Sequence, residues 1–318
     1  MHRKQLFNIL KIIVSAGLLV FIFSSIDAQA FFKAVRQAKP AWLILAFSLV
    51  MLGVVIRAFR WQILLEAIGV SVPLAELSAI YFIGFLFNNL LPSGLGGDAI
   101  RMLELNRHSQ RGSDAVTSVV VDRFLGLSSL QAIALVALLI DWGAAPLAVA
   151  YFTIAIFISG LIIGYLLINR SLYATLRQHV GLFRRVTNLK TIGNLFESFQ
   201  RYPLAALGRA YVVSIFFNIL LIAMNMSIGL GLGAEASLAQ YAIFVPITSL
   251  VLLIPISFAG LGVREGAYIQ LFGQVGVPQE IAVAISLLVY IFGNVCTGLI
   301  GGLIYLLRSA RGVVSEEG

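Results

Sequence analysis

The fold is decided by an interruption inside an apolar segment. It reads NNLLPSGLGGDAIR over residues 88–101, and a similar one, IPISFAGLGVRE, follows over residues 254–265. Proline cannot continue the hydrogen bonding of a helix, and glycine adopts positive φ angles at little cost. Each stretch therefore predicts a helix, a break, and a second helix that turns back.

Charged residues are scarce along the rest of the chain. Of its 318 residues, 60% are hydrophobic and 11% charged, with a mean hydropathy of +0.98. A soluble domain is about 25% charged, so this composition excludes an ordinary soluble protein. The formal net charge of +8 then reflects basic loops on the cytoplasmic side of a membrane, and no nucleic-acid partner is expected.

The residues needed for metal, disulfide or hydrolytic chemistry are not brought together by the sequence. One cysteine (Cys296) and three histidines far apart (His2, His108, His179) exclude an intrachain disulfide and a Cys/His metal spacing. The phosphate-binding loop of ATPases, the nucleophile elbow and the His-Glu-x-x-His motif do not occur. We expect no cofactor and no enzymatic activity in this chain.

Eight apolar stretches are long enough, or nearly so, for the roughly 20 residues that a spanning helix needs. They are Leu6–Ile26, Ala41–Ile56, Leu74–Leu91, Ala115–Ile140, Pro146–Ile168, Ala210–Leu232, Leu238–Ile256 and Glu280–Leu307. Membrane strands would alternate polar and apolar residues, and these runs do not. The prediction is an all-α, polytopic membrane bundle forming one transmembrane domain over residues 1–318.

Lysine and arginine in short loops indicate the sidedness. If the N-terminus is cytoplasmic and residues 74–110 and 238–275 return to the side they entered, 16 such residues lie inside and three outside. If all eight segments cross, a cytoplasmic N-terminus places the seven basic residues of 169–209 outside the cell. The reversed orientation instead places both basic termini outside. We therefore favour six spans plus two re-entrant hairpins with inverted pseudo-symmetry, in a bacterial inner membrane with both termini cytoplasmic. Full crossing by the hairpins stays open.

The two breaks are also the candidate binding site. Broken backbone at membrane depth must be buried in protein or line a wet cavity. A helix starting after Gly97 would offer free N–H groups, with Arg101 one turn on, which suits a phosphate. Arg264 and Glu265 repeat this arrangement, and Asp98 and Glu265 are expected to cap the two helices. In the alternative reading, the glycines only shape a packed turn and the charges only cap.

Asp122 and Arg123 are charges inside another apolar run, where they are costly and usually face the bundle interior. Neighbours on a helix do not face each other, so each needs its own partner. We expect Arg123 to reach Asp98 or a ligand phosphate, and Asp122 to reach Arg101 or Arg264. The alternative is that these charges form only structural ion pairs within the bundle near the cytoplasmic interface. The full set of candidate substrate-binding residues is Asn88, Asn89, Pro92, Gly94, Gly96, Gly97, Asp98, Arg101, Asp122, Arg123, Pro255, Gly260, Gly262, Arg264 and Glu265.

These motifs, in this order, resemble the lysylphosphatidylglycerol synthase transmembrane family of flippase-like membrane proteins. The resemblance covers nearly the whole chain. It implies that fused members carry an additional aminoacyltransferase domain, which does not appear before Gly318, so synthesis of lysyl-lipid by this chain is not expected. Stand-alone members are associated with other lipids, including hopanoids and lipid-linked sugars, so the resemblance leaves the substrate open.

The function hypothesis is a lipid translocase whose central cavity binds an anionic or phosphate-bearing lipid. The alternatives are a non-transporting subunit that presents lipid to, or scaffolds, a separate lipid-modifying enzyme, and a secondary transporter of a small ion or solute. Residues 169–209, with seven basic residues and one acid, predict amphipathic helices on the cytoplasmic surface that are attracted to anionic lipid, or an ordinary basic loop. The oligomeric state is not predicted.

Overall fold

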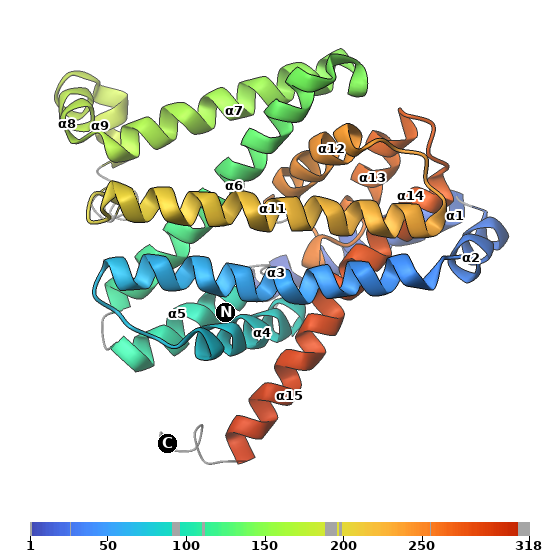
Figure 1. Cartoon of the computed structure of the whole chain (residues 1–318), viewed down its shortest axis with the longest axis horizontal. Coiled ribbons are helices and arrows are strands. Elements are labelled where there is room, and N and C mark those ends of the chain that lie inside the picture. The colour runs from blue at the N-terminus through green and yellow to red at the C-terminus, as the bar shows by residue number, and fades with distance from the viewer. Residues whose placement is uncertain are drawn as a thin grey trace.

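The chain forms a bundle of helices in the computed structural model (Figure 1). The structure describes residues 2–25, 27–90, 96–109, 112–187, 196, 199–254 and 256–310. Within those ranges every regular element is a helix, which confirms the predicted all-α, polytopic class.

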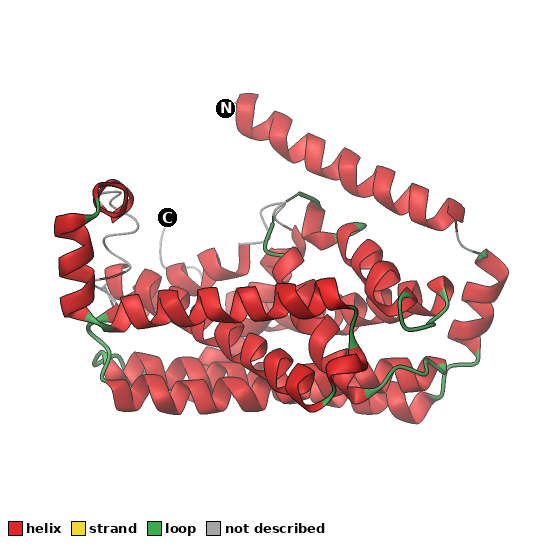
Figure 2. Cartoon of the chain, turned by 90° about the horizontal axis from the view of Figure 1, so that it is seen from above, coloured by secondary structure: helices red, strands yellow, loops and turns green. Residues whose placement is uncertain are grey.

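Five helical segments are long and apolar enough to cross a membrane. They are α3 (Pro40–Ala67), α6 (Gly112–Ile140), α7 (Leu147–Ile168), α11 (Leu204–Leu232), and a segment composed of α14 (Gln279–Tyr290), the π-helical η3 (Ile291–Cys296) and α15 (Thr297–Ala310). A sixth results if α1 (His2–Ser25) and α2 (Ala28–Arg36), bent by 90°, are taken together. Figure 2 shows α1 splayed to one side of the bundle.

The span predicted over Ala41–Ile56, with Arg57 and Arg60 counted in a cytoplasmic loop over residues 57–73, is too short. Helix α3 continues to Ala67, so Arg57 and Arg60 are helical rather than cytoplasmic loop residues. The helix ends just before Gly69, whose φ of +78° is the left-handed conformation that glycine commonly adopts after the end of a helix. The two arginines can remain in the helix because their side chains find partners inside the bundle.

The predicted hairpins are the places where the helices are short. Helix α4 (Leu74–Leu90) packs against α5 (Gly96–Ser109), and α12 (Leu238–Val251) packs against α13 (Val263–Gly273), which the short 3₁₀ turn η2 (Phe258–Gly260) precedes. The order of lengths repeats: 28, 17, 14 and 29 residues from α3 to α6, then 29, 14 and 11 from α11 to α13, and 31 in the spanning stretch Gln279–Ser309.

Helices α3 and α11, which open the two repeats, lie side by side and run in opposite directions (Figure 1). An inverted repeat requires this antiparallel relation. Whether the hairpins return to the membrane face they entered stays a prediction.

The two hairpins are closed in different ways. In the first, Gly97 lies so near α4 that a Cβ placed on it would be 2.6 Å from the carbonyl oxygen of Gly84. In the second, Gly260 and Gly262 have φ angles of +77° and +83°, as the sequence predicted for the turn. Helix α1 covers this turn, where Ser15 Oγ accepts a 2.6 Å hydrogen bond from the Phe258 N–H.

The basic segment after α7 also begins with helices. They are α8 (Arg170–His179) and α9 (Gly181–Thr187). Before α7, the short 3₁₀ turn η1 (Trp142–Ala144) joins α6 to α7. The Tyr173 ring of α8 stacks on Phe196, with centroids 4.2 Å apart, and meets Phe183 edge-on. The apolar faces of the two helices therefore pack together, while Arg177, Arg184 and Arg185 are exposed.

Candidate functional site

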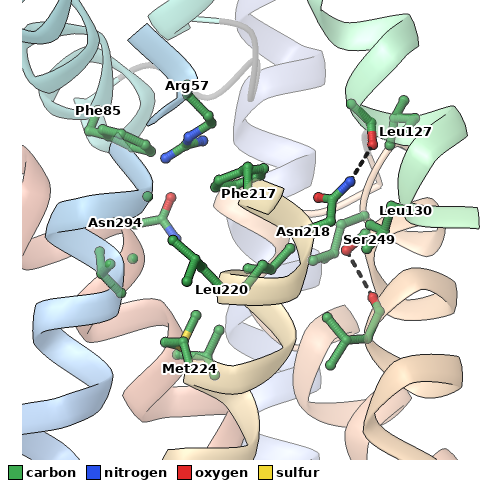
Figure 3. A pocket seen from close by; sticks show the side chains of 18 of the residues that line it. Arg57, Phe85, Leu127, Leu130, Phe217, Asn218, Leu220, Met224, Ser249 and Asn294 are labelled. Carbon is green, nitrogen blue, oxygen red and sulfur yellow. Dashed lines mark hydrogen bonds between the residues drawn. The ribbon is translucent and has the colours of Figure 1, made fainter. Parts of the chain in front are cut away.

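A cavity of about 420 Å³ is lined by residues of both hairpins. Helices α3, α6 and α11 and the π-helical segment complete its wall (Figure 3). The candidate residues that line it are Asn88, Gly97, Asp98, Arg101, Asp122, Arg123 and Arg264. Asn89, Gly96, Gly260, Gly262 and Glu265 lie outside this lining, and Pro92, Gly94 and Pro255 lie outside the described residues.

Asp122 is the centre of a buried polar network. Its Oδ1 is 2.6 Å from Arg60 Nε, and its Oδ2 is 3.0 Å from Arg101 Nη2. The hydroxyl of Tyr81 donates a 2.8 Å hydrogen bond to Oδ2. Arg60, Arg101 and Asp122 are at most 5% exposed. The predicted pairing of Asp122 with Arg101 is confirmed, and such a pair is retained in an apolar interior only when its charges are matched and hydrogen-bonded.

Asp98 is the second carboxylate that binds arginines at this cavity. It forms an ion pair with Arg123, as predicted, and a longer contact of 3.4 Å with Arg101 Nη1. Arg123 keeps 38% of its side chain exposed, whereas Asp98 is buried. Arg60, Arg101 and Arg123 therefore all contact a carboxylate, and both aspartates are committed to arginines.

The two asparagines before the break are structural clamps. Asn88 Oδ1 accepts a 2.7 Å hydrogen bond from the Gly97 N–H, so it caps α5 from the preceding helix. Asn89 Nδ2 donates to the Asn294 carbonyl oxygen at 2.7 Å. Asn294 belongs to the π-helical segment, and such bulges occur frequently at functional sites. The first hairpin is thus tied to the last span at the cavity wall.

Glu265 caps the second hairpin. Its Oε2 accepts a 2.6 Å hydrogen bond from the Gly262 N–H, and its Oε1 accepts a 2.9 Å hydrogen bond from Ser286 Oγ. The residue is fully buried. Both carboxylate oxygens are therefore engaged in holding α13 and α14, in agreement with the expected cap.

Arg264 follows a different pattern from Arg60, Arg101 and Arg123. It is 7% exposed and lines the cavity. Its Nη2 donates to the Ala259 carbonyl oxygen at 3.3 Å, and its guanidinium carbon lies 5.0 Å from the centre of the Tyr290 ring. Asp122, which the sequence allowed as its partner, bonds Arg60 and Arg101 instead.

Arg57 is a cavity residue that the sequence reasoning missed. Its guanidinium carbon lies 4.8 Å from the ring centres of both Phe85 and Phe217, between which it is drawn in Figure 3. The missed signal was the absence of any helix breaker between Ile56 and Gly69, together with the spacing of Arg57 and Arg60, which places both on one helix face.

Positive charge predominates among the residues that line the cavity. Five arginines and two carboxylates are found among its described lining residues. No group of His, Cys, Asp and Glu within the described part of the chain could hold a metal ion. Guanidinium groups carry fixed charge and several donors, which suits binding of phosphate rather than proton transfer.

The apolar helices indicate a multi-pass membrane protein, and its cavity carries several arginines. Residues 8–301 match the family described as the lysylphosphatidylglycerol synthase transmembrane region, so the chain belongs to that family. This confirms the resemblance read from the two breaks and from Asp122-Arg123. The description concerns a transmembrane region, not a catalytic domain, and indicates a role related to membrane lipid.

Three relatives carry the name UPF0104 membrane protein. The one from Pyrococcus horikoshii is 22% identical over 97% of this chain and 99% of its own length. The one from Methanothermobacter thermautotrophicus is 25% identical over 89% of each chain. The Methanocaldococcus jannaschii protein is 29% identical over 36% of this chain and 34% of its own. These names state a membrane location and no activity.

Proposed function

We propose that this chain is a lipid translocase that binds a phosphate-bearing or otherwise polar lipid headgroup in its cavity and moves it between leaflets. The observation that carries the proposal is the surplus of arginine in the cavity lined by both hairpins. Buried charge is expensive in a membrane protein and usually marks a substrate pathway. Family membership supports a lipid as that substrate.

The size and the opening of the cavity fit a headgroup. Ligand pockets usually measure about 300–1,000 Å³, and this one, at about 420 Å³, falls at the lower end. It can therefore enclose a headgroup while the acyl chains stay outside. Two lining residues reach the surface, since Leu253 is 47% exposed and the Arg123 side chain 38%. Polar donors inside would replace the water that a headgroup loses.

Reconstitution tests the proposal. The protein is placed in vesicles of phosphatidylcholine and phosphatidylglycerol that carry a trace of fluorescently labelled phosphatidylglycerol, and dithionite bleaches the outer leaflet. We expect the wild type to bring inner-leaflet label to the surface, and Arg264→Gln to slow this by about tenfold or more. Arg209→Gln, at an exposed position of α11 outside the cavity lining, is the matched control.

Two results would count against the proposal. Retention of a defined lipid by a wild type that moves none would favour a subunit that presents lipid to, or scaffolds, a separate lipid-modifying enzyme. Equal rates for wild type, Arg264→Gln and Arg209→Gln would remove the arginine from the mechanism.

A further inference from the structure

Unpartnered polar atoms gather at the cavity. Among the described side chains, eight buried nitrogen or oxygen atoms have no hydrogen-bond partner, and four of them belong to residues that line this one cavity. The four are Arg57 Nε, Arg101 Nε, Thr248 Oγ1 and Arg264 Nη1. Buried polar groups are satisfied in most native structures, so a local concentration of unpaired donors points to a ligand that accepts hydrogen bonds.

Two of these arginines also have no paired charge. Arg101 bonds Asp122 and Asp98, whereas neither Arg57 nor Arg264 forms an ion pair with any described carboxylate. Arg57 comes from α3 in the first repeat, and Arg264 from α13 in the second. The uncompensated positive charge of the cavity is thus supplied by both halves of the molecule.

Aromatic rings contact both of these guanidinium groups. Phe85 and Phe217 pack against Arg57, and Tyr290 packs against Arg264. Stacking covers the flat faces of a guanidinium and leaves its N–H groups pointing outward in the plane. An acceptor with two or more oxygens can then be held edge-on, as phosphate is by arginine.

Carboxylates available for a cationic headgroup are missing from the described lining. Asp98 and Asp122 are the acidic residues there, and both are already bound to arginines. A zwitterionic or aminoacylated headgroup brings an ammonium group that would be desolvated without a partner. A headgroup with net negative charge avoids that cost.

We propose that Arg57 and Arg264 together bind one phosphate ester anion, and that the cavity selects lipids with net negative headgroups over zwitterionic and aminoacylated ones. This rests on the proposed function and names its substrate class. Arg60, Arg101 and Asp122 form the fixed wall against which the anion sits.

Binding to the whole purified chain in detergent tests the pair directly. The probes are dioctanoyl phosphatidylglycerol, its lysyl ester, dioctanoyl phosphatidylcholine, deacylated glycerophosphoglycerol and inorganic phosphate, titrated by calorimetry. We expect phosphatidylglycerol to bind tightest, and Arg57→Gln and Arg264→Gln each to raise its dissociation constant about tenfold or more. Arg209→Gln should leave it unchanged, and circular dichroism checks that every variant is folded.

The double variant and the lysine variants show whether one anion is shared. Contacts to a common ligand are not additive, so Arg57→Gln with Arg264→Gln should weaken binding by less than the product of the two single effects. Arg264→Lys should recover part of the affinity, because it restores charge without the two-donor edge. Multiplicative effects would overturn the shared site.

Three further outcomes separate the possible failures. Equal affinity for phosphatidylcholine or the lysyl ester overturns the selectivity, and equal affinity for inorganic phosphate overturns the lipid as the source of the anion. Arginine-dependent binding without lipid movement in vesicles would defeat the translocase and leave the anion site standing. Lipid movement that is unchanged in the Arg57→Gln and Arg264→Gln variants would defeat the anion site and leave the translocase standing.

Discussion

The two hairpins share a break rich in glycine but use their charges differently. After the first break, Asp98 and Arg101 form ion pairs with each other and with charged residues of α6, where Asp122 also binds Arg60 of α3. After the second break, both carboxylate oxygens of Glu265 accept hydrogen bonds at the start of α13 and from α14. Its neighbour Arg264 keeps a buried N–H without a partner. The same pattern of residues thus builds a network of ion pairs on one side and, on the other, an arginine that forms no ion pair with a described carboxylate.

This difference separates two roles, stabilising the bundle and binding a ligand, that the sequence motif alone does not distinguish. A buried ion pair contributes little net stability, but removal of one partner is costly because the other charge stays behind. A buried cation without a partner is a standing cost, which a ligand can relieve. Variants in the first hairpin should therefore affect stability, and those at Arg264 should affect ligand binding.

The largest effect is expected for Asp122→Asn. It leaves Arg60 and Arg101 without their shared carboxylate, which should cost about 3–5 kcal/mol of unfolding free energy. The loss is measured as a fall in the thermal midpoint in detergent, followed by tryptophan fluorescence. Asp141→Asn, at an exposed position after α6, is the control. An unchanged midpoint for Asp122→Asn would show that the network does not stabilise the bundle.

The glycines at the start of α5 and within α13 should respond in opposite directions. A Cβ on Gly97 would lie 2.6 Å from the Gly84 carbonyl oxygen, so Gly97→Ala should cost about 1–3 kcal/mol. Helical Gly266 has nothing within 4 Å of an added Cβ, so Gly266→Ala should be neutral or stabilising by up to about 1 kcal/mol. The same melting experiment compares them, and equal shifts would contradict the close packing of α4 on α5.

A smaller loss is expected for Asn88→Ala. It removes the oxygen that accepts from the Gly97 N–H and should cost about 1 kcal/mol, the usual contribution of a helix cap. Hydrogen exchange of the α5 amides followed by mass spectrometry should rise locally, with no change in α13. Uniform exchange across both hairpins would argue that Asn88 is not a local clamp.

The smallest effect is expected at the pair that joins α4 to α15. Arg308 Nη1 and Nη2 lie 2.7 and 2.8 Å from the two carboxylate oxygens of Glu76, but both side chains are more than a fifth exposed. Glu76→Gln should therefore cost only about 0–1 kcal/mol. The exchanged pair Glu76→Arg with Arg308→Glu should melt near the wild-type midpoint, and a large loss in the exchanged pair would point to packing rather than charge.

Much of the architecture followed from local signals. The two proline and glycine breaks predicted where helices become short, and charges inside apolar runs predicted the contacts of Asp122 with Arg101 and of Arg123 with Asp98. These predictions succeeded because turn chemistry is local and because a membrane interior permits few unpaired charges.

The predictions failed where tertiary contacts override local composition. Arg57 and Arg60 lie beyond the predicted span Ala41–Ile56. In the structure both are helical, because Asp122, 62 positions after Arg60, forms an ion pair with Arg60, and aromatic rings contact Arg57. No sequence signal marked the π-helical turn at Ile291–Cys296, whose carbonyl oxygen at Asn294 is bound by Asn89. Such partners are visible only once distant helices are packed together.

Native mass spectrometry of the gently solubilised protein tests the central claim most directly. The wild type and Arg209→Gln should each retain a phospholipid with a net negative headgroup, and the combined Arg57→Gln and Arg264→Gln variant should lose it while staying folded. Retention of the same lipid by the combined variant, or a wild type that carries no selected lipid, would contradict the assignment of the two unpaired arginines to ligand binding.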